Sequence, residues 1–433
     1  MLKPHVVILG AGFGGVYVAK YLEKLVHKGV IDLTIVNRTN YFLFTPLLHE
    51  VATGGLNPRT VAEPLREVFV NTGIHIVQGT ISSIDSDSRT VKVDGTFESV
   101  NIPYDYLVIA TGAETNYYNI PGAETFTYPL KNLVEAARIR SRVIDCFEQA
   151  ILTNDRVERA KLLSFAVVGG GATGVEVTAE LAELIDGMVK RYFSDLEHCA
   201  PSDSSICLPE EPTLTLVHTG SMVLEQFTMH LRESAERRLL HDGVRLQLNS
   251  TVTSVTKDGL TLSGDMKIPA RTIIWAAGVK PIIPHFSNRA PQLFGNRLAV
   301  DSYFRLEGND RIFAIGDVAG YLDPDEKERD PKHVLPMLAQ VAESSSKIVA
   351  YNIKASVMGK KLKMLHYHSM GSMVSVGQWF AIGEILSQKI AGAFTWWLWR
   401  TVYLFKFASW RKRIRIAFEW TFELFYPRDI TKL

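Results

Sequence analysis

Residues 5–15, HVVILGAGFGG, and residues 165–174, FAVVGGGATG, each place a short apolar strand directly before a GxGxxG turn and an amphipathic helical pattern. In such a turn the first glycine permits a tight bend, and the second lets backbone amides approach a pyrophosphate. The third lets the helix pack closely on the strand. Two turns in this context predict two bound nucleotides. The glycines are Gly10, Gly12 and Gly15 in the first turn and Gly169, Gly171 and Gly174 in the second.

The composition is that of a foldable chain without polyelectrolyte character. The 433 residues are 46% apolar and carry a net charge of +1, which predicts two or three domains and no nucleic-acid partner. The N-terminus lacks the pattern of a signal peptide, so we expect no export. The cysteines show neither CxxC nor metal-ligand spacing. We therefore predict reduced thiols and no metal site, with a Cys199/Cys207 disulfide as the alternative.

The residues around the first turn extend the predicted nucleotide site. Gly14 lies inside the turn, and the strand IDLTIVN at 31–37 ends in Asn37, where such folds usually carry an acid that binds a ribose. Asn37 still accepts and donates hydrogen bonds, and we expect it to contact the nucleotide with the adjacent Arg38. The stretch NYFLFTPLLHEVATGGLNP at 40–58 predicts an ordered loop near the nucleotide, with core packing as the alternative.

Three further apolar strands end in polar or glycine residues. YDYLVIATG at 104–112 ends in Thr111 and Gly112, and RTIIWAAGV at 271–279 contains Gly278. Each follows one glycine turn at a comparable place, which indicates an internal duplication. RIFAIGDVAG at 311–320 includes Gly316 and Asp317, and this carboxylate could hold a ribose or polyol hydroxyl, or cap a helix.

Along the chain follow, in this order, the motifs NYFLFTPLLHEVATGGLNP, ATGAETNYYNIPG, GGGATGVEVTAEL, WAAGV, IFAIGDVA, LPMLAQVA and HYHSMGSMVSVG. In these motifs and their order, over nearly its whole length, the chain resembles the type II NADH:quinone oxidoreductases, the single-subunit respiratory NADH dehydrogenases among the two-dinucleotide-binding flavoproteins. The resemblance implies that the first turn binds FAD, with Asp317 near the ribityl chain, and that the second binds NADH. It also implies hydride transfer from NADH to FAD and then transfer of two electrons to a membrane quinone, without proton pumping.

The resemblance assigns two catalytic residues. Glu176 matches the family's glutamate near the flavin and would assist proton delivery to quinone; the alternative is a first-turn acid that complements the helix dipole. Gln340 matches a glutamine at the quinone pocket, with a solvated polar position as the alternative. The chain departs from the family at Ser344, where a second glutamine is usual, and at Met370, where a basic residue is usual. Both departures bear on the quinone site.

A third departure concerns the nicotinamide nucleotide. The strand LTLVH ends in His218, where the family usually has a glutamate. That acid binds the adenosine ribose and repels a 2′-phosphate. We therefore predict weaker discrimination against NADPH than is usual in the family.

From Ala391 the chain interleaves aromatic and basic residues: AGAFTWWLWRTVYLFKFASWRKRIRIAFEWTFELFYPRD. Arg400 and Lys406 interrupt the first stretch, so it is too short to span a bilayer. The pattern is typical of helices that lie in the membrane plane, and a dimerisation helix pair or a core lid is the alternative. On a helix, one side would carry Trp410, Ile414, Ala417, Phe418, Thr421 and Phe425, and the other Arg411, Arg415, Glu419 and Glu423.

We therefore predict an α/β protein with two Rossmann-like dinucleotide-binding domains and a C-terminal amphipathic membrane-binding region. The FAD-binding domain would comprise 1–112 and 290–355. The NADH-binding domain would comprise 113–289 with an insertion near 188–212, and the C-terminal region 356–433. The expected partners are a membrane quinone and the lipid surface, on the cytoplasmic side of the cell inner membrane, and a homodimer is a further possibility.

Two other classes of function stay open from the sequence. One is another flavin-dependent NAD(P)H reductase of the same fold. Disulfide reductases need a cysteine pair close after the first glycine turn, and sulfide:quinone oxidoreductases need cysteines late in the chain, where none follows Cys207. The other class is a non-catalytic nucleotide sensor, which intact glycine turns do not exclude.

Overall fold

The computed structural model describes residues 3–193, 212–326, 328–386, 388–407 and 409–432. Its contacts divide the chain into two compact units. Unit 1 comprises Met1–Leu43, Ala62–Glu114 and Val279–Ser369, and unit 2 comprises Phe44–Val61, Thr115–Gly278 and Met370–Leu433. These units differ from the predicted domains in several respects: residues 279–289, predicted in the NADH-binding domain, and residues 356–369, predicted in the C-terminal region, belong to unit 1. Phe44–Val61 and the chain from Met370 onward group with unit 2, because they pack against its helices.

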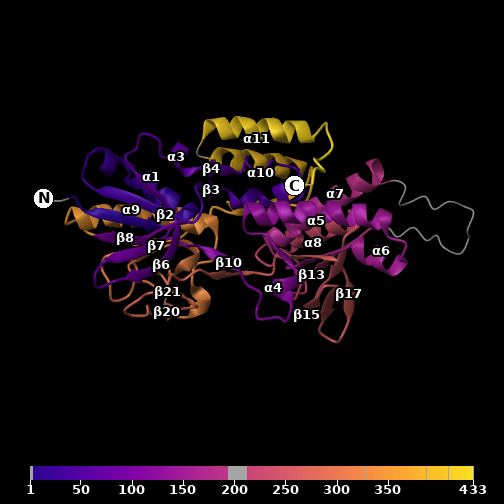
Figure 1. Cartoon of the computed structure of the whole chain (residues 1–433), viewed down its shortest axis with the longest axis horizontal. Coiled ribbons are helices and arrows are strands. Elements are labelled where there is room, and N and C mark those ends of the chain that lie inside the picture. The colour runs from indigo at the N-terminus through magenta and orange to yellow at the C-terminus, as the bar shows by residue number, and fades with distance from the viewer. Residues whose placement is uncertain (1–2, 194–211, 327, 387, 408, 433) are drawn as a thin grey trace, which may run out of the picture. The chain divides into compact units, whose positions relative to one another are not determined.

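Unit 1 is built on a parallel sheet of five strands in the order β22-β9-β1-β2-β5. β1 (His5–Leu9) lies in the middle and leads through the first glycine turn into α1 (Phe13–His27), which packs against α9 (Ala339–Val357) (Figure 1). An antiparallel sheet, β6-β7-β8, separates β5 from β9 along the chain. The strands are β2 (Asp32–Asn37), β5 (His75–Gln78), β6 (Thr80–Asp85), β7 (Thr90–Asp94), β8 (Ser99–Pro103), β9 (Tyr106–Ile109) and β22 (Ile312–Ala314).

Unit 2 repeats this arrangement around a parallel sheet in the order β11-β18-β12-β13-β14. β12 (Ser164–Val168) leads through the second glycine turn into α7 (Ala172–Arg191). The antiparallel sheet β15-β16-β17 again precedes the strand that pairs with the glycine-turn strand. The other elements are β11 (Tyr128–Pro129), α5 (Leu133–Leu152), β13 (Thr213–Val217), α8 (Met229–His241), β14 (Arg245–Gln247), β15 (Val252–Thr256), β16 (Gly259–Leu262), β17 (Lys267–Pro269) and β18 (Thr272–Trp275).

The two sheets confirm the predicted α/β architecture with two Rossmann-like domains. Equivalent hydrogen bonds hold the two glycine turns: the Gly10 amide donates to Val36 (2.8 Å), and the Gly169 amide donates to Val217 (2.8 Å). Strands β1 and β12 are almost wholly buried, because both faces of a parallel sheet are covered. The short elements are β10 (Ala113–Thr115), α4 (Ala123–Phe126), α6 (Arg156–Leu162), α3 (Leu65–Val68), β19 (Val279–Pro281), β20 (Leu293–Phe294), β21 (Arg297–Ala299), η3 (Gly316–Val318), β23 (Ala319–Gly320) and η4 (Pro331–His333).

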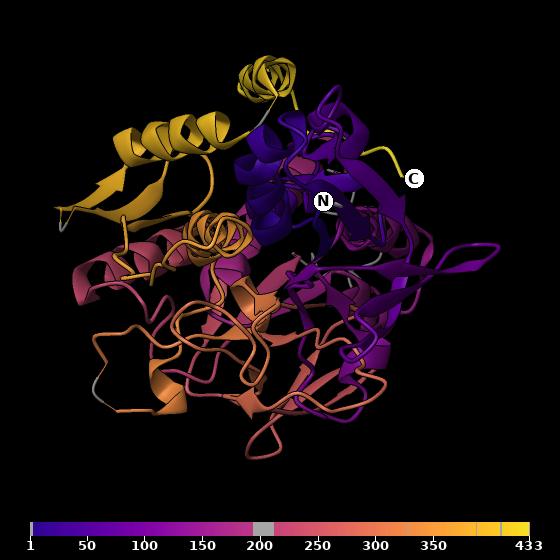
Figure 2. The ribbon, with the colours of Figure 1, turned by 90° about the vertical axis from the view of Figure 1, so that its left-hand side faces the viewer.

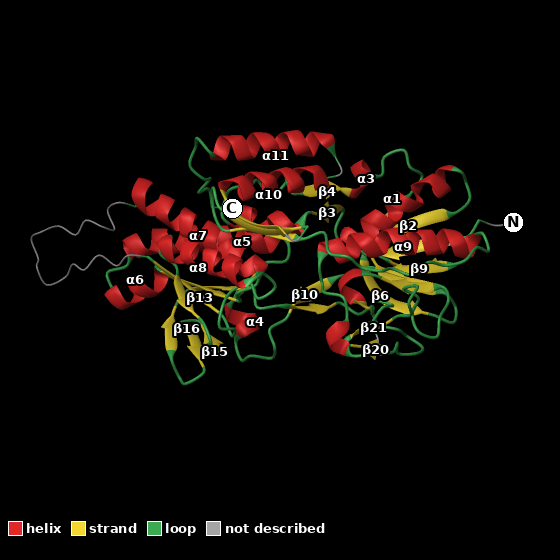
Figure 3. Cartoon of the chain, turned by 180° about the vertical axis from the view of Figure 1, so that it is seen from behind, coloured by secondary structure: helices red, strands yellow, loops and turns green. Residues whose placement is uncertain are grey.

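The C-terminal part of unit 2 is an antiparallel sheet followed by two helices. The sheet comprises β24 (Ser372–Ser375), β25 (Ala381–Ile385) and β26 (Gln388–Gly392), and α10 (Ala393–Lys406) packs against it (Figure 2). α11 (Trp410–Glu423) runs beside α10 (Figure 3). Phe425, predicted on the apolar side of this helix, lies beyond its end.

The stretch at 40–58 is more regular than the predicted loop. It contains β3 (Tyr41–Leu43), which pairs with β4 (Ala62–Pro64), a 3-10 helix η1 (Thr45–Leu47) and the short helix α2 (Leu48–Ala52). The loop prediction was wrong here because α2 is only five residues long and is held by packing on α5 and α7 rather than by its own periodicity. The predicted insertion near 188–212 lies mostly outside the described residues, as do Cys199 and Cys207.

Candidate functional sites

The first glycine turn has an open cradle at its middle glycine. Gly10 has φ +100°, and a Cβ there would lie 2.3 Å from the Ala110 carbonyl oxygen; a Cβ on Gly15 would lie 1.9 Å from the Gly10 oxygen. A Cβ on Gly12 would meet nothing within 4 Å among the described residues. The outer glycines are therefore required by the turn and the packing, while the space at Gly12 is left for a ligand.

The second turn has the same geometry. Gly169 has φ +117° and its Cβ would lie 2.3 Å from the Ala276 oxygen, and a Cβ on Gly174 would lie 1.8 Å from the Gly169 oxygen. Around Gly171 the described chain again leaves 4 Å of open space. Two independent turns thus present the same cradle.

Both cradles lie at helix N-termini that are suited to phosphate. Gly12 and Gly171 are the N-caps of α1 and α7. In the described structure neither helix has a side-chain cap or an acid in its first turn. By contrast, α5 is closed by a capping box of Asn132 and Glu135. The amides of α1 and α7, with the positive ends of their dipoles, are therefore available to a pyrophosphate.

The residues around the first cradle hold its backbone. Asn37 accepts a hydrogen bond from the Ala11 amide at Oδ1 (2.9 Å), so its side chain orients the glycine turn, while Arg38 is exposed. Gly14 faces α9: its carbonyl accepts from the Ser346 hydroxyl (2.9 Å). The turn is thus fixed from both sides before any ligand binds.

The ends of β9 and β22 bring further predicted residues into unit 1. Thr111 donates its hydroxyl to Ile282 (2.6 Å), and the Gly112 carbonyl accepts from the Ile282 amide (2.9 Å). Gly316, with φ +68°, opens η3, and Asp317 follows it, half-buried. η3 packs against α9, whose first turn carries the half-buried Gln340.

The strand ends of unit 2 carry Gly278 and His218. Gly278 has φ +153°, and a Cβ there would lie 2.3 Å from the Tyr118 hydroxyl. His218 follows β13 directly, and its Nδ1 accepts from the Gly170 amide (3.2 Å). Its Nε2 lies 3.7 Å from a carboxylate oxygen of Glu225. Glu225 was not predicted, because only the fold brings it to the end of β13.

Glu176 lies in the second turn of α7, so it is not the first-turn acid of the alternative interpretation. Its carboxyl is buried, 3.6 Å from His49 Nδ1 on α2. Burial raises the pKa of Glu176 well above its ordinary value, although a hydrogen bond from the Ser375 backbone acts in the opposite direction. Burial lowers the pKa of His49 to about 4. Burial therefore favours the neutral form of both groups, and a carboxyl with a raised pKa is suited to hold or pass a proton.

A network of buried charged groups that the sequence analysis missed surrounds Glu176. Arg428 binds Glu180 (2.5 Å), Glu183 (2.6 Å) and Glu423 (3.5 Å), and Arg400 binds Glu423 (3.0 Å). The spacing of Glu176, Glu180 and Glu183 on one helix was a readable signal. Arg400, Glu423 and Arg428 gave no such signal in the sequence, because charged residues in the tail are expected on the solvated side of an amphipathic helix. The acid network comprises Glu50, Glu176, Glu180, Glu183 and Glu423 with Arg400 and Arg428.

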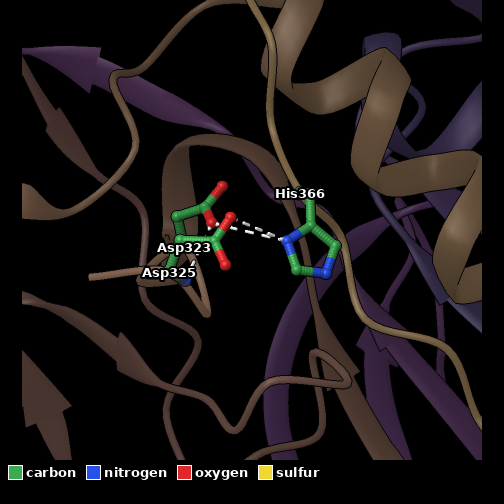
Figure 4. A group of neighbouring side chains, drawn as sticks. All are labelled: Asp323, Asp325 and His366. Carbon is green, nitrogen blue, oxygen red and sulfur yellow. Dashed lines mark hydrogen bonds and ion pairs between the residues drawn. The ribbon is translucent and has the colours of Figure 1, made fainter. Parts of the chain in front are cut away.

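Elsewhere in unit 1, Asp323, Asp325 and His366 form an exposed cluster with metal-ligating atoms (Figure 4). His366 Nδ1 lies 3.0 Å from Asp325 Oδ2, and Asp323 accepts from the Tyr367 amide (2.7 Å). These contacts join the loop after β23 to the segment before β24. We assign the cluster no metal, because its mutual ion pairs account for it.

Cys146, the cysteine within the described residues, is a buried free thiol beside Thr272 (3.3 Å). Burial raises the pKa of its thiol. It is therefore unsuited to disulfide exchange, which requires an accessible thiolate.

Two equivalent phosphate cradles on two parallel sheets define a protein with two dinucleotide-binding domains. Residues 4–346 match the pyridine nucleotide-disulphide oxidoreductase family, and the chain belongs to that family. Residues 369–429 match the NDH2 C-terminal domain.

Similar proteins of comparable length include NADH dehydrogenases. The chain is 29% identical over 433 residues to a probable NADH dehydrogenase of Dictyostelium discoideum, covering 98% of this chain and 90% of that protein. It is 29% identical over 432 residues to a type II NADH:quinone oxidoreductase of Mycobacterium tuberculosis, covering 96% and 86%. The structure of NDH2 from Plasmodium falciparum in complex with NADH has the same fold, with a TM-score of 0.86 and 23% identity over 99% of this chain and 100% of that one.

Proposed function

We propose that this protein is an NADH:quinone oxidoreductase that carries FAD in unit 1, binds NADH in unit 2 and does not pump protons. The observation that carries the proposal is the pair of equivalent cradles at Gly12 and Gly171, in a chain whose last part matches the NDH2 C-terminal domain. When bound, FAD and NADH supply the redox chemistry, and the protein's task is to hold and orient them.

The residues of unit 1 fit FAD. The amides of α1 and the space at Gly12 would hold the pyrophosphate, in a turn that Asn37 orients. Asp317 lies past the end of β22, where a carboxylate can accept hydrogen bonds from the hydroxyls of the ribityl chain. Gln340 on the adjoining helix is proposed to contact the quinone.

The residues of unit 2 fit NADH. The amides of α7 and the space at Gly171 would hold its pyrophosphate, with His218 beneath the turn. Because a carboxylate of Glu225 lies beside His218, it supplies a negative charge close to where the family's strand-end glutamate would be. Glu225 would therefore restore part of the repulsion of a 2′-phosphate that His218 by itself lacks.

Aromatic residues line the outward side of the C-terminal helices. Trp410, Phe418 and Phe422 are 65%, 62% and 59% exposed, while the charged Glu419 and Glu423 of α11 turn toward the protein. On the surface helix of a soluble protein the apolar side faces the protein and the charged side faces solvent, so this distribution of side chains is reversed. Among the described helices, none is long and apolar enough to cross a bilayer. We propose that this aromatic face lies in the lipid surface of the cell inner membrane, on the side where NADH is supplied.

An anaerobic titration tests the function. The detergent-solubilised protein is expected to show a visible flavin band that NADH bleaches and that a soluble quinone then restores. A flavin that NADH does not bleach would contradict the proposal, and so would a bleached flavin that quinone does not reoxidise. A nucleotide sensor would bind NADH without either spectral change.

A further inference from the structure

The proposed reaction takes up one proton from water in each turnover. NADH gives up a hydride, which is two electrons and one proton. A quinone needs two electrons and two protons to become a quinol. The second proton therefore comes from water, and it needs a route if it is delivered through the buried carboxyl of Glu176, the residue that the resemblance assigns to proton delivery.

Three glutamates of α7 form a ladder that leads from Glu176 toward solvent. Glu176, Glu180 and Glu183 are spaced four and three residues apart, so their carboxyls lie on one side of the helix. Successive rungs are separated by about 6 Å or less along the axis, a gap that side-chain reach and one water molecule close. The side chains of Glu176 and Glu180 are 10% and 6% exposed, and that of Glu183 is 20% exposed.

The outer end of the ladder opens on a cavity. Glu183 lines a cavity of about 580 Å³ together with Arg238, Gln378 and Arg428. The Gln378 amide donates to Glu183, and Arg238 lies 3.9 Å from its carboxyl. The most exposed carboxyl of the three thus lines a space large enough to admit water.

The acid network holds more carboxyls than cations. Its five glutamates outnumber the guanidiniums that face them, which are those of Arg400, Arg428 and Arg238, and Arg238 is paired more closely with Asp242 (2.6 Å). A buried excess of negative charge is costly, so part of the carboxyls must hold protons at neutral pH. Burial raises the pKa of Glu50 and of Glu183 to about 8 in each case. The groups that face the ladder are His49 and Glu50 on α2, Arg238 on α8, Arg400 and Tyr403 on α10, Glu423 on α11, and Arg428.

Arg428 and Trp420 keep these carboxyls in place. Arg428 is the positioning residue, because it binds both Glu180 and Glu183, and Trp420 donates to Glu50 (2.6 Å). Glu180 also lies close enough to raise the pKa of His49, the group in contact with Glu176. The network is thus continuous from the cavity to Glu176.

We propose that Glu183, Glu180 and Glu176 relay the proton of quinone reduction from this cavity into the protein. Glu176 releases its proton to the developing quinol, and Glu180 then passes its proton to Glu176. Glu183 reprotonates Glu180 and takes a proton from water in its turn, so that one proton moves from water to the quinol. The relay rests on the proposed function. To that function the relay adds a route for the proton and two residues on it, Glu180 and Glu183.

Stopped-flow measurement of the two half-reactions tests the relay. In Glu180→Gln, bleaching of the flavin by NADH is expected at the wild-type rate, while its return with quinone slows roughly 10- to 100-fold, within the range for lost acid–base assistance. The solvent deuterium isotope effect on the quinone step should increase. In Glu183→Gln, which changes the rung at the cavity, millimolar acetate should restore part of the rate, because a small acid can enter there.

Glu158→Gln is the matched control, since Glu158 binds Arg271 through both oxygens (2.6 Å each) but lies on α6, outside the network. It should leave both half-reactions unchanged. Wild-type quinone rates in both ladder variants would overturn the relay, and so would equal slowing of both half-reactions with no change in isotope effect and no acetate rescue. Failure of NADH to bleach the wild-type flavin would instead contradict the proposed function itself.

Discussion

The middle and last glycines of the second turn, Gly171 and Gly174, should respond differently to substitution by alanine. A methyl group on Gly174 would lie 1.8 Å from the Gly169 oxygen, so α7 and the turn must separate by about 1 Å. A methyl group on Gly171 meets nothing within 4 Å in the described structure, and the backbone there is extended (φ −77°, ψ −177°), which any residue adopts. Gly174→Ala thus perturbs folding, and Gly171→Ala perturbs only the ligand's space.

The magnitudes follow from these contacts. Overpacking of this kind costs about 1–3 kcal/mol, which lowers the Tm of a protein this large by roughly 2–10 °C. Gly171→Ala should leave Tm within about 1 °C. It blocks the approach of one phosphate to the helix amides, and a hydrogen bond to a charged group contributes about 1.5–3 kcal/mol. The KM for NADH should therefore rise roughly 10- to 150-fold.

The assay is steady-state NADH oxidation with a soluble quinone, combined with thermal unfolding and flavin content. Both variants should retain flavin, because the second turn belongs to unit 2 and the predicted FAD cradle to unit 1. The reasoning is refuted if Gly171→Ala lowers Tm as much as Gly174→Ala does while the KM for NADH stays at the wild-type value.

Three further predictions concern specificity, membrane binding and pH. Glu225→Gln should lower the NADH/NADPH ratio of kcat/KM about 3- to 10-fold, a modest change because Glu225 is largely exposed and its charge is screened. His218→Glu should raise that ratio. Unchanged ratios in both variants would show that neither residue discriminates between the two nucleotides at the adenosine ribose. Phe418→Glu on the aromatic face should weaken sedimentation with anionic vesicles at least about 10-fold, since burying a Phe contributes about 1.5–3 kcal/mol, and it should leave the flavin spectrum and Tm unchanged. Glu50 binds its proton more tightly in the folded protein (pKa about 8) than in the unfolded chain (4.5), so its contribution to stability falls as pH rises from 4.5 to 8. In Tm measurements from pH 5 to 9, Glu50→Gln should decline less with pH than the wild type. An equal decline of Tm in the two proteins would contradict the buried location of the carboxyl.

Local patterns predicted the parts of the fold that repeat at short range. The strands before the glycine turns, the helices after them and the helix beginning at Trp410 all appear where periodicity placed them. The elements in the stretch at 40–58 could not be predicted in this way, because α2 is too short to show a helical period. Its His49 and Glu50 become buried through contact with α7, α10 and α11.

The candidate sites divide in the same way. The glycine cradles could be predicted because their chemistry lies within eleven consecutive residues. The acid network could not, since its members come from α2, α7, α10, α11 and the segment after it. Glu423 illustrates the difficulty: on the helical pattern it belongs to the charged side of a surface helix, and in the structure it is 5% exposed between two arginines.

The sequence by itself determined the two nucleotide folds, because a GxGxxG turn between strand and helix is a local geometric requirement, which only glycine meets at the first and last positions. It also determined the amphipathic character of the tail. Only the tertiary structure decided which side of that tail faces the protein, and that Glu50, Glu180, Glu183 and Arg428 share one buried volume. Burial and charge pairing depend on groups far apart along the chain, and no local pattern encodes them.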